Sequence, residues 1–191
     1  MVRDSNLGRE FFARRAPVVA SELLGACFVN PEGIIIRITE TEAYTEGDPA
    51  SHSFRGPTKR NAVMFGPPGH LYVYFIYGTH WCANISTGPA GVGEAVLLRG
   101  GVVEAGMELV RFRRGPGVRE AALTNGPAKL CQALGITGTE SGIDLCARHG
   151  YQVRSRREPV PFVVTKRIGV SVGRETLWRF LALRDSRKVV D

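Results

Sequence analysis

The chain has few of the features that define several protein classes. Its 191 residues include only four cysteines, at positions 27, 82, 131 and 146, and no C-x-x-C pair. Structural zinc sites use close ligand pairs, and disulfide scaffolds use a much higher density of cysteine. We therefore expect reduced thiols that pack as small hydrophobic side chains, and we predict no metal site and no other cofactor.

Long apolar segments are also missing. The longest unbroken apolar run, Leu71–Tyr77, has seven residues, whereas a membrane-spanning helix needs about 20. The first residues, Met1–Asn6, are polar and lack the apolar stretch of a signal peptide. We expect a soluble, intracellular protein without a membrane partner, cytoplasmic or nucleoid-associated in a bacterium and nuclear in a eukaryote.

Acidic residues are scarce in the last part of the chain. The net charge is +7, and residues 148–191 hold 11 of the 25 Lys and Arg but only 4 of the 18 Asp and Glu. Most of the basic residues are arginines, which bind phosphate in a bidentate manner. A basic chain of this kind is typical of nucleic-acid-binding proteins, although charge alone favours a polyanionic partner only modestly.

Glycine and proline divide the chain into short segments, and neither a repeat nor a long linker is present. A length of 191 residues fits one domain, so we predict a single domain over residues 1–191. Residues 45–70 form a long irregular stretch, and a loop of that length is usually functional or disordered. The predicted fold is a mixed α/β (α+β) class with mainly antiparallel strands.

The individual elements follow from periodicity and from turn residues. We expect helical segments over residues 9–24, broken near Pro17, and over 124–135, and strands over 34–44, 71–77, 81–86, 94–99, 162–165 and 168–172. Residues 177–183 fit either a helix or a strand by pattern alone.

The strand over residues 34–44 ends in acidic and aromatic residues. A period of two places Glu40, Glu42 and Tyr44 on the same face as the isoleucines that precede them. This pattern is typical of a strand whose end leaves the core for a cleft, although a solvated strand end fits it as well. Tyr44 leads into the long loop that contains His52, which favours the cleft.

Two strands around Gly78 predict a β-hairpin rich in tyrosine. Tyr72 and Tyr74 share one face, and Tyr77 lies at the tip. Core packing accounts for Val73 and Tyr72 but not for an aromatic residue at an exposed tip, which indicates contact with a partner. Aromatic side chains beside positive charge fit stacking on nucleic-acid bases.

Several dense sequence strings resemble the alkyladenine (3-methyladenine) DNA glycosylase family, in the same order over nearly the whole chain. The matching strings are Glu40-Thr-Glu-Ala-Tyr44, His52-Ser, Met64-Phe65, Leu71-Tyr-Val-Tyr, Ile76-Tyr-Gly78, Asn84-Ile-Ser86, Val96-Leu-Leu-Arg99, Asn125–Leu134 and Arg167-Ile-Gly-Val170.

The resemblance implies a monofunctional base-excision repair enzyme that rotates a damaged purine out of double-stranded DNA and hydrolyses its N-glycosidic bond with water. Expected substrates are 3-methyladenine, 7-methylguanine, hypoxanthine and ethenoadenine. The implied fold is a curved antiparallel sheet with flanking helices, a strand over residues 177–183, and a protruding hairpin that inserts into DNA. We expect a monomer as the simplest DNA-binding form.

The same resemblance implies roles for three catalytic residues. Glu42 would be the general base that activates the water, and Arg99 and the backbone carbonyl of Ile168 would help to hold that water. A positioned general base typically contributes about 10²–10⁴-fold to the rate.

The base pocket is also implied by the resemblance. Tyr44 and His52 would stack on one face of the extruded base and Tyr74 on the other. Asn84 would exclude normal guanine by opposing the exocyclic amine of that base. The spacing between Tyr44 and His52 is one residue shorter than in the family, which affects how His52 stacks.

The DNA-contacting residues follow in the same way. Tyr77 would fill the gap that the flipped nucleotide leaves in the minor groove, with Thr79 and His80 beside it at the hairpin tip. Better-known family members carry bulkier residues at these last two positions. Lys166 and Arg167 would contact phosphates flanking the flipped nucleotide.

The hairpin register is a separate geometric prediction. If Tyr74 and Asn84 both face the base, they lie on one side of the hairpin. Direct pairing of these two residues implies a three-residue connection, Gly78–His80. A two-residue connection would turn Asn84 to the opposite face, so we predict the three-residue form.

Two other functions fit parts of the sequence. A metal-dependent nuclease could use Glu40, Glu42 and Asp48 around magnesium, although alternating strand positions followed by a tyrosine make a poor cation cage. A non-catalytic protein that binds single-stranded or damaged nucleic acid needs only the tyrosines and arginines.

Overall fold

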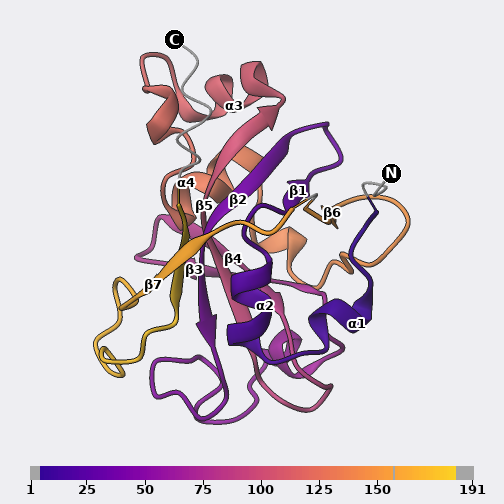
Figure 1. The fold of residues 1–191 in the computed structure, drawn as a ribbon, viewed down its shortest axis with the longest axis vertical. Coiled ribbons are helices and arrows are strands. Elements are labelled where there is room, and N and C mark those ends of the chain that lie inside the picture. The colour runs from indigo at the N-terminus through magenta and orange to yellow at the C-terminus, as the bar shows by residue number, and fades with distance from the viewer. Residues whose placement is uncertain (1–4, 157, 184–191) are drawn as a thin grey trace.

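The computed structural model describes residues 5–156 and 158–183. Within these residues, eight antiparallel strands form one curled sheet (Figure 1). The strands are β1 (Cys27–Val29), β2 (Ile35–Tyr44), β3 (Leu71–Ile76), β4 (His80–Ser86), β5 (Ala95–Ala105), β6 (Gln152–Arg154), β7 (Phe162–Thr165) and β8 (Arg179–Ala182). Their order is β3-β4-β5-β2-β1-β6, and β8, which pairs with β7, adds to β2. The predicted α+β class with antiparallel strands is confirmed.

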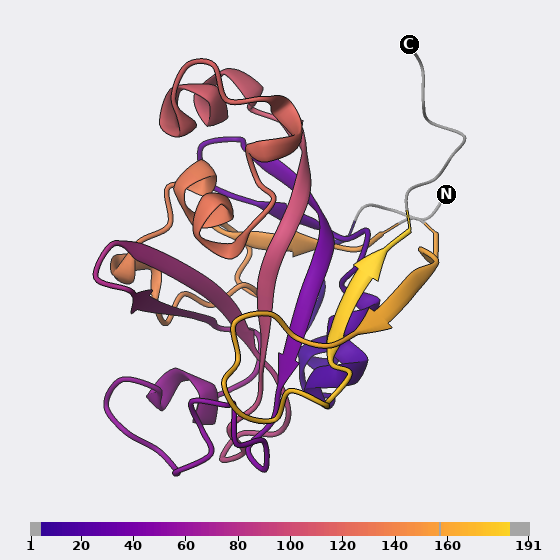
Figure 2. The same ribbon diagram turned by 90° about the vertical axis from the view of Figure 1, so that its left-hand side faces the viewer.

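Short helices cover the sheet. They are α1 (Arg9–Phe12), α2 (Ala16–Glu22), α3 (Met107–Arg114) and α4 (Pro127–Leu134), with 3₁₀ turns η1 (Ala62–Phe65), η2 (Glu120–Ala122) and η3 (Gly138–Glu140). Gly135 ends α4 with a φ of 71°, a conformation that glycine adopts without strain. In Figure 2, α2 and α4 lie on opposite sides of the sheet: α2 contacts β2 and β5, and α4 contacts β4 and β5.

A large hydrophobic core joins these elements, and its members run from Phe12 to Phe180; a second, small cluster contains Met64, Tyr72 and Ala95. Helix α4 contributes its apolar stripe, including Leu130 and Leu134, against β4 and β5. The thiols of Cys82 and Cys131 are buried and free, as expected for small hydrophobic side chains.

Strand β2 is the central strand and places the candidate site. It pairs with β5 on one edge, while its other edge is shared by β1, at Ile35–Arg37, and β8, at Glu40–Glu42. Two register shifts against β5, between Ile38 and Thr41, interrupt the strict alternation that the sequence predicts. Thr41 donates its hydroxyl to the Ala20 carbonyl of α2, so the next residue, Glu42, faces away from α2.

One predicted strand is absent, and the predicted end of another strand is wrong. Residues 168–172 are irregular instead of extended, because Gly169 and Gly173 take positive φ values and the Ile168 N–H binds a side chain instead of a neighbouring strand. Strand β5 continues to Ala105 instead of ending at Arg99. A Cβ at Gly101 would lie 2.7 Å from the Arg37 carbonyl oxygen, so this glycine permits close strand packing and does not end the strand.

Candidate active site

The β3–β4 hairpin has a three-residue connection, but the predicted register is wrong. Tyr74 pairs with Cys82, and Tyr72 pairs with Asn84. The connection is 77–79 instead of 78–80, because Tyr77 turns out of the extended conformation and the last pair is Ile76 with His80. Both registers have the same parity, so Tyr74 and Asn84 still lie on one side of the hairpin.

Tyr77 occupies an unusual position at the hairpin tip. Its side chain is 80% exposed, and its φ of 53° is the sole positive value of a non-glycine residue in the described ranges. The left-handed conformation costs an L-residue about 1–2 kcal/mol. Thr79 and His80 beside it are also exposed. The exposed ring of Tyr77 buries little surface, so it does not offset this cost within the fold.

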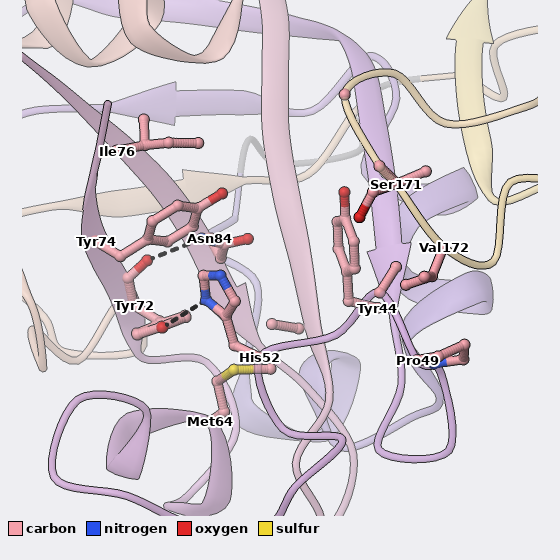
Figure 3. A pocket seen from close by; sticks show the side chains of 14 residues that line it. Tyr44, Pro49, His52, Met64, Tyr72, Tyr74, Ile76, Asn84, Ser171 and Val172 are labelled. Atoms are coloured by element: carbon pink, nitrogen blue, oxygen red, sulfur yellow. Dashed lines mark hydrogen bonds between the residues drawn. The ribbon is translucent and has the colours of Figure 1, made fainter. Parts of the chain in front are cut away.

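A cavity of about 230 Å³ opens between the hairpin, the 45–70 loop and residues 169–172 (Figure 3). This volume is below the roughly 300–1,000 Å³ of drug-sized sites and suits one planar ring system. The lining residues are Tyr44, Pro49, Ala50, His52, Met64, Tyr72, Tyr74, Ile76, Asn84, Ala95, Gly169, Val170, Ser171 and Val172.

Aromatic side chains form two walls of the cavity. His52 packs edge-to-face on Tyr74, with ring centroids 4.5 Å apart, and its Nδ1 lies 2.9 Å from the Tyr72 hydroxyl. Tyr44 faces these two rings from the other side (Figure 3). The predicted grouping of His52 with Tyr44 is therefore wrong, because the hydrogen bond to Tyr72 holds the imidazole against strand β3.

The electrostatics keep these aromatic groups uncharged. Burial raises the pKa of Tyr44 above its ordinary value, and the Glu42 carboxylate raises it further. Burial, followed by the Cys82 thiol, raises the pKa of Tyr74. Partial burial and then the Arg60 guanidinium lower the pKa of His52. At neutral pH the cavity therefore presents neutral phenols and a neutral imidazole.

Asn84 lies at the back of the cavity, between the two walls (Figure 3). Its side chain is buried, and its Nδ2 donates to the Tyr72 carbonyl at 3.2 Å. This bond orients the amide and leaves its second N–H and its oxygen available to a group in the cavity.

Glu42 is fully buried behind the Tyr44 side of the cavity. The Tyr44 hydroxyl donates to Oε2 at 2.8 Å, and the Ile168 N–H donates to Oε1 at 2.8 Å. Nε of Arg99 lies 3.4 Å from Oε1. All three contacts come from donors, which suits an anionic carboxylate. Ile168 contacts the site through its N–H, a contact not expected from the sequence.

A second acidic side chain balances the charge beside Glu42. Oε1 of Glu40 accepts from Nε of Arg99 at 2.8 Å and from Nε of Arg179 at 2.7 Å. The two carboxylates are thus surrounded by guanidinium groups, and the chain brings them together because β2, β5 and β8 are adjacent.

Arg167 is buried and contacts Tyr44, one of the residues that line the cavity. Its guanidinium forms an ion pair with both carboxylate oxygens of Asp48, donates to the Ala43 and Gly173 carbonyls, and lies 4.8 Å from the centroid of the Tyr44 ring. This placement is incompatible with the predicted phosphate contact. Arg167 instead holds Tyr44 in place, and sequence alone could not pair residues 119 positions apart.

Comparison with known proteins identifies the family of this chain. The family model described as Methylpurine-DNA glycosylase (MPG) matches residues 10–186. The chain belongs to the methylpurine-DNA glycosylase family. As a member of this family it is an N-glycosylase that acts on DNA.

Relatives support the assignment over most of the chain. A protein of Mycolicibacterium fortuitum is 48% identical over 178 residues, which cover 90% of this chain and 91% of the relative. A protein of Carboxydothermus hydrogenoformans is 46% identical over 91% of this chain and 93% of its own. For one of Methanoculleus marisnigri the identity is 46%, over 94% and 95%. All three carry names that assign them to the 3-methyladenine DNA glycosylases.

The remaining predicted residues of this glycosylase lie at its surface. Lys166 is 60% exposed at its side chain, and its Nζ lies 2.7 Å from Glu175.

The nuclease alternative is weakened, because Asp48 pairs with Arg167 and Glu40 with Arg99, and no three His, Cys, Asp or Glu side chains of the described ranges are grouped to hold a metal. Nor does any helix of those ranges have the length and apolar character to span a bilayer.

Proposed function

We propose that this glycosylase removes alkylated and deaminated purines from double-stranded DNA by flipping them into the 230 Å³ cavity, and that Glu42 activates the attacking water. The substrate class would comprise 3-methyladenine, 7-methylguanine, hypoxanthine and ethenoadenine. The observation that carries the proposal is the neutral aromatic cavity directly beside a buried carboxylate held by three donors.

The geometry of Glu42 suits a general base. A carboxylate has about four acceptor positions, and the Tyr44 hydroxyl and the Ile168 N–H use two of them. The remaining positions can accept a proton from a water, which the Ile168 carbonyl and Arg99 would help to hold. The negative charge of Glu42 would also stabilise the positive charge that develops on the sugar as the glycosidic bond breaks.

The cavity walls suit a damaged purine. Alkylated purines such as 3-methyladenine carry a positive charge, which is favourable between the faces of electron-rich rings. A protonated His52 would oppose that charge, and its lowered pKa avoids this repulsion. The free amide groups of Asn84 would discriminate against the exocyclic amine of normal guanine. A damaged base also costs less to extrude, which adds to selection.

The hairpin tip would stabilise the extruded state. Tyr77 is held outward in a left-handed conformation, and an inserted side chain of this size can occupy the space that a flipped nucleotide leaves in the minor groove. We propose that the protein acts on the duplex as a monomer, the simplest DNA-binding form.

The test uses duplexes that each contain one of the four lesions, an undamaged duplex, and detection of the released base. Wild-type protein should release free base without cutting the strand, in the presence of a chelator. Glu42→Gln should bind the lesion duplex and release almost no base. Chelator-sensitive strand cleavage would support the nuclease alternative, and absence of release from all four lesions would support the non-catalytic one.

A further inference from the structure

A basic segment of the 45–70 loop lies next to the cavity without lining it. Residues 53–61, called the basic loop here, contain Arg55, Lys59 and Arg60 and no acidic residue. All three cationic side chains are exposed. In the described part of the chain none of them has a carboxylate partner, in contrast to the arginines around Glu40, Glu42 and Asp48.

Buried polar side chains hold the basic loop in one shape. The fully buried Ser53 donates its hydroxyl to the Gly93 carbonyl at 2.6 Å. Asn61, 2% exposed, accepts the Thr58 N–H at 2.6 Å and donates to the His52 carbonyl at 2.8 Å. Because these anchors are inside, the cationic side chains between them are directed outward, on a loop that is ordered before any partner binds.

Arg60 places the basic loop at the entrance of the cavity. Its Nη2 donates to the Phe75 carbonyl of β3 at 3.1 Å, and its guanidinium lies 5.8 Å from the centroid of the Tyr74 ring. A guanidinium has five N–H donors, so most of them remain available. The loop therefore lies between the hairpin and the mouth of the cavity.

A cation at this entrance needs an anionic partner when an alkylated base occupies the cavity. An alkylated purine carries a positive charge, and Arg60 close to Tyr74 would repel it. A DNA phosphate bound to Arg60 would neutralise that repulsion and would use the unpaired donors of the loop. The two neighbouring cations, Arg55 and Lys59, extend the same surface along the loop.

We propose that Arg55, Lys59 and Arg60 bind backbone phosphates beside the flipped nucleotide, so that the basic loop forms a second part of the DNA interface next to the hairpin tip. This inference rests on the proposed function for the position of the nucleotide. It assigns to the basic loop the phosphate contact that the sequence predicts for the buried Arg167.

The test measures the affinity for an undamaged duplex as a function of salt. Arg55→Ala/Lys59→Ala is the main variant, because both side chains are exposed and neither forms a hydrogen bond or an ion pair with the described residues. Each phosphate contact contributes about 0.9 to the log–log slope, so we expect the slope to decrease by about 1.8. Arg60→Ala should lower it by about 0.9 more.

The matched control is Arg119→Ala/Lys129→Ala, which removes the same charge from an exposed arginine and from a partly buried lysine that bonds only to the Asn125 amide in the described ranges. These residues belong to α4 and to the segment that follows α3, toward the opposite end of the molecule from the 45–70 loop (Figures 1 and 2). The control should keep the wild-type slope. An equal decrease in the control, or an unchanged slope in the loop variant, would overturn the inference.

Base release separates this inference from the proposed function. At saturating enzyme, Arg55→Ala/Lys59→Ala should release base from a lesion duplex at the wild-type single-turnover rate, since the loop acts in binding. A slower rate at saturation would contradict a binding role. If wild-type protein released no base from any lesion, the proposed function would fail, whereas the salt slopes would still decide whether the loop contacts duplex DNA.

Discussion

The buried centre of this glycosylase and its basic loop use the same charged residue types in opposite ways. In the centre, Arg99 and Arg167 are ion-paired with carboxylates and inaccessible to a large partner. On the basic loop, Arg55 and Lys59 are exposed and have no carboxylate partner in the described ranges.

The difference follows from the cost of burial. A charge that leaves water must be paired and hydrogen-bonded, so the buried Arg167 supports Tyr44 from behind the cavity and the largely buried Arg99 lies beside Glu42. An exposed cation keeps its solvent and its counterions, and releasing counterions is what drives phosphate binding. Burial, rather than residue type, therefore separates the arginines that shape the site from those that can bind DNA.

The largest effect should distinguish the two carboxylates of the buried centre. Glu42→Gln should lower the single-turnover rate of base release by about 10²–10⁴-fold, because the general base is lost. Glu40→Gln, next to the same Arg99, should lower this rate much less, since Glu40 only balances the charge of the neighbouring guanidinium groups. Comparable losses in both variants would contradict the assignment of Glu42 as the base.

A large effect on stability should distinguish a buried ion pair from an exposed one. Asp48→Ala leaves the guanidinium of Arg167 buried without its partner, and breaking a buried pair costs about 3–5 kcal/mol. Asp144→Ala removes the partner of Arg9 in a pair whose side chains are 36–40% exposed, which costs about 0–1 kcal/mol. Urea unfolding of both variants measures the free energies.

The hairpin tip should show opposite effects on folding and on binding. Tyr77→Gly relieves a left-handed conformation that costs about 1–2 kcal/mol, so the free energy of unfolding should stay the same or rise. Loss of the aromatic side chain should weaken duplex binding by about 1–3 kcal/mol. Thermal unfolding and duplex titration measure the two effects. A destabilised variant with unchanged affinity would make Tyr77 a structural residue.

The smallest effect concerns pH. The pKa of His52 is lowered in the folded protein, so below about pH 6.5 the unfolded chain binds a proton that the folded chain resists. The contribution of His52 to stability is present above this pH and decreases as the pH falls through it. In His52→Asn the decrease between pH 7.5 and pH 5.5 should be smaller, as measured by urea unfolding at both pH values.

Most elements of the fold could be predicted from local pattern. The strand up to Tyr44, the tyrosine hairpin and the helix ended by Gly135 all carry clear periodicity and turn residues, and the structure confirms them. Short β1 and β6 and the helix α3 were not predicted, because three residues define no period and half of the α3 residues are charged. The apolar residues of segment 168–172 give the pattern of a strand. They line the cavity instead of pairing with another strand, and the pattern could not show this.

The sequence by itself determined the family, the α+β class and the residue types of the site, because these depend on strings and periodicities that are local in the chain. Only the tertiary structure decided which side chains meet. It paired Arg167 with Asp48, placed His52 on Tyr74 instead of beside Tyr44, and left the cations of the basic loop unpaired. Burial and long-range contact set the state of a charged or aromatic side chain, and neither is a property of the neighbouring sequence.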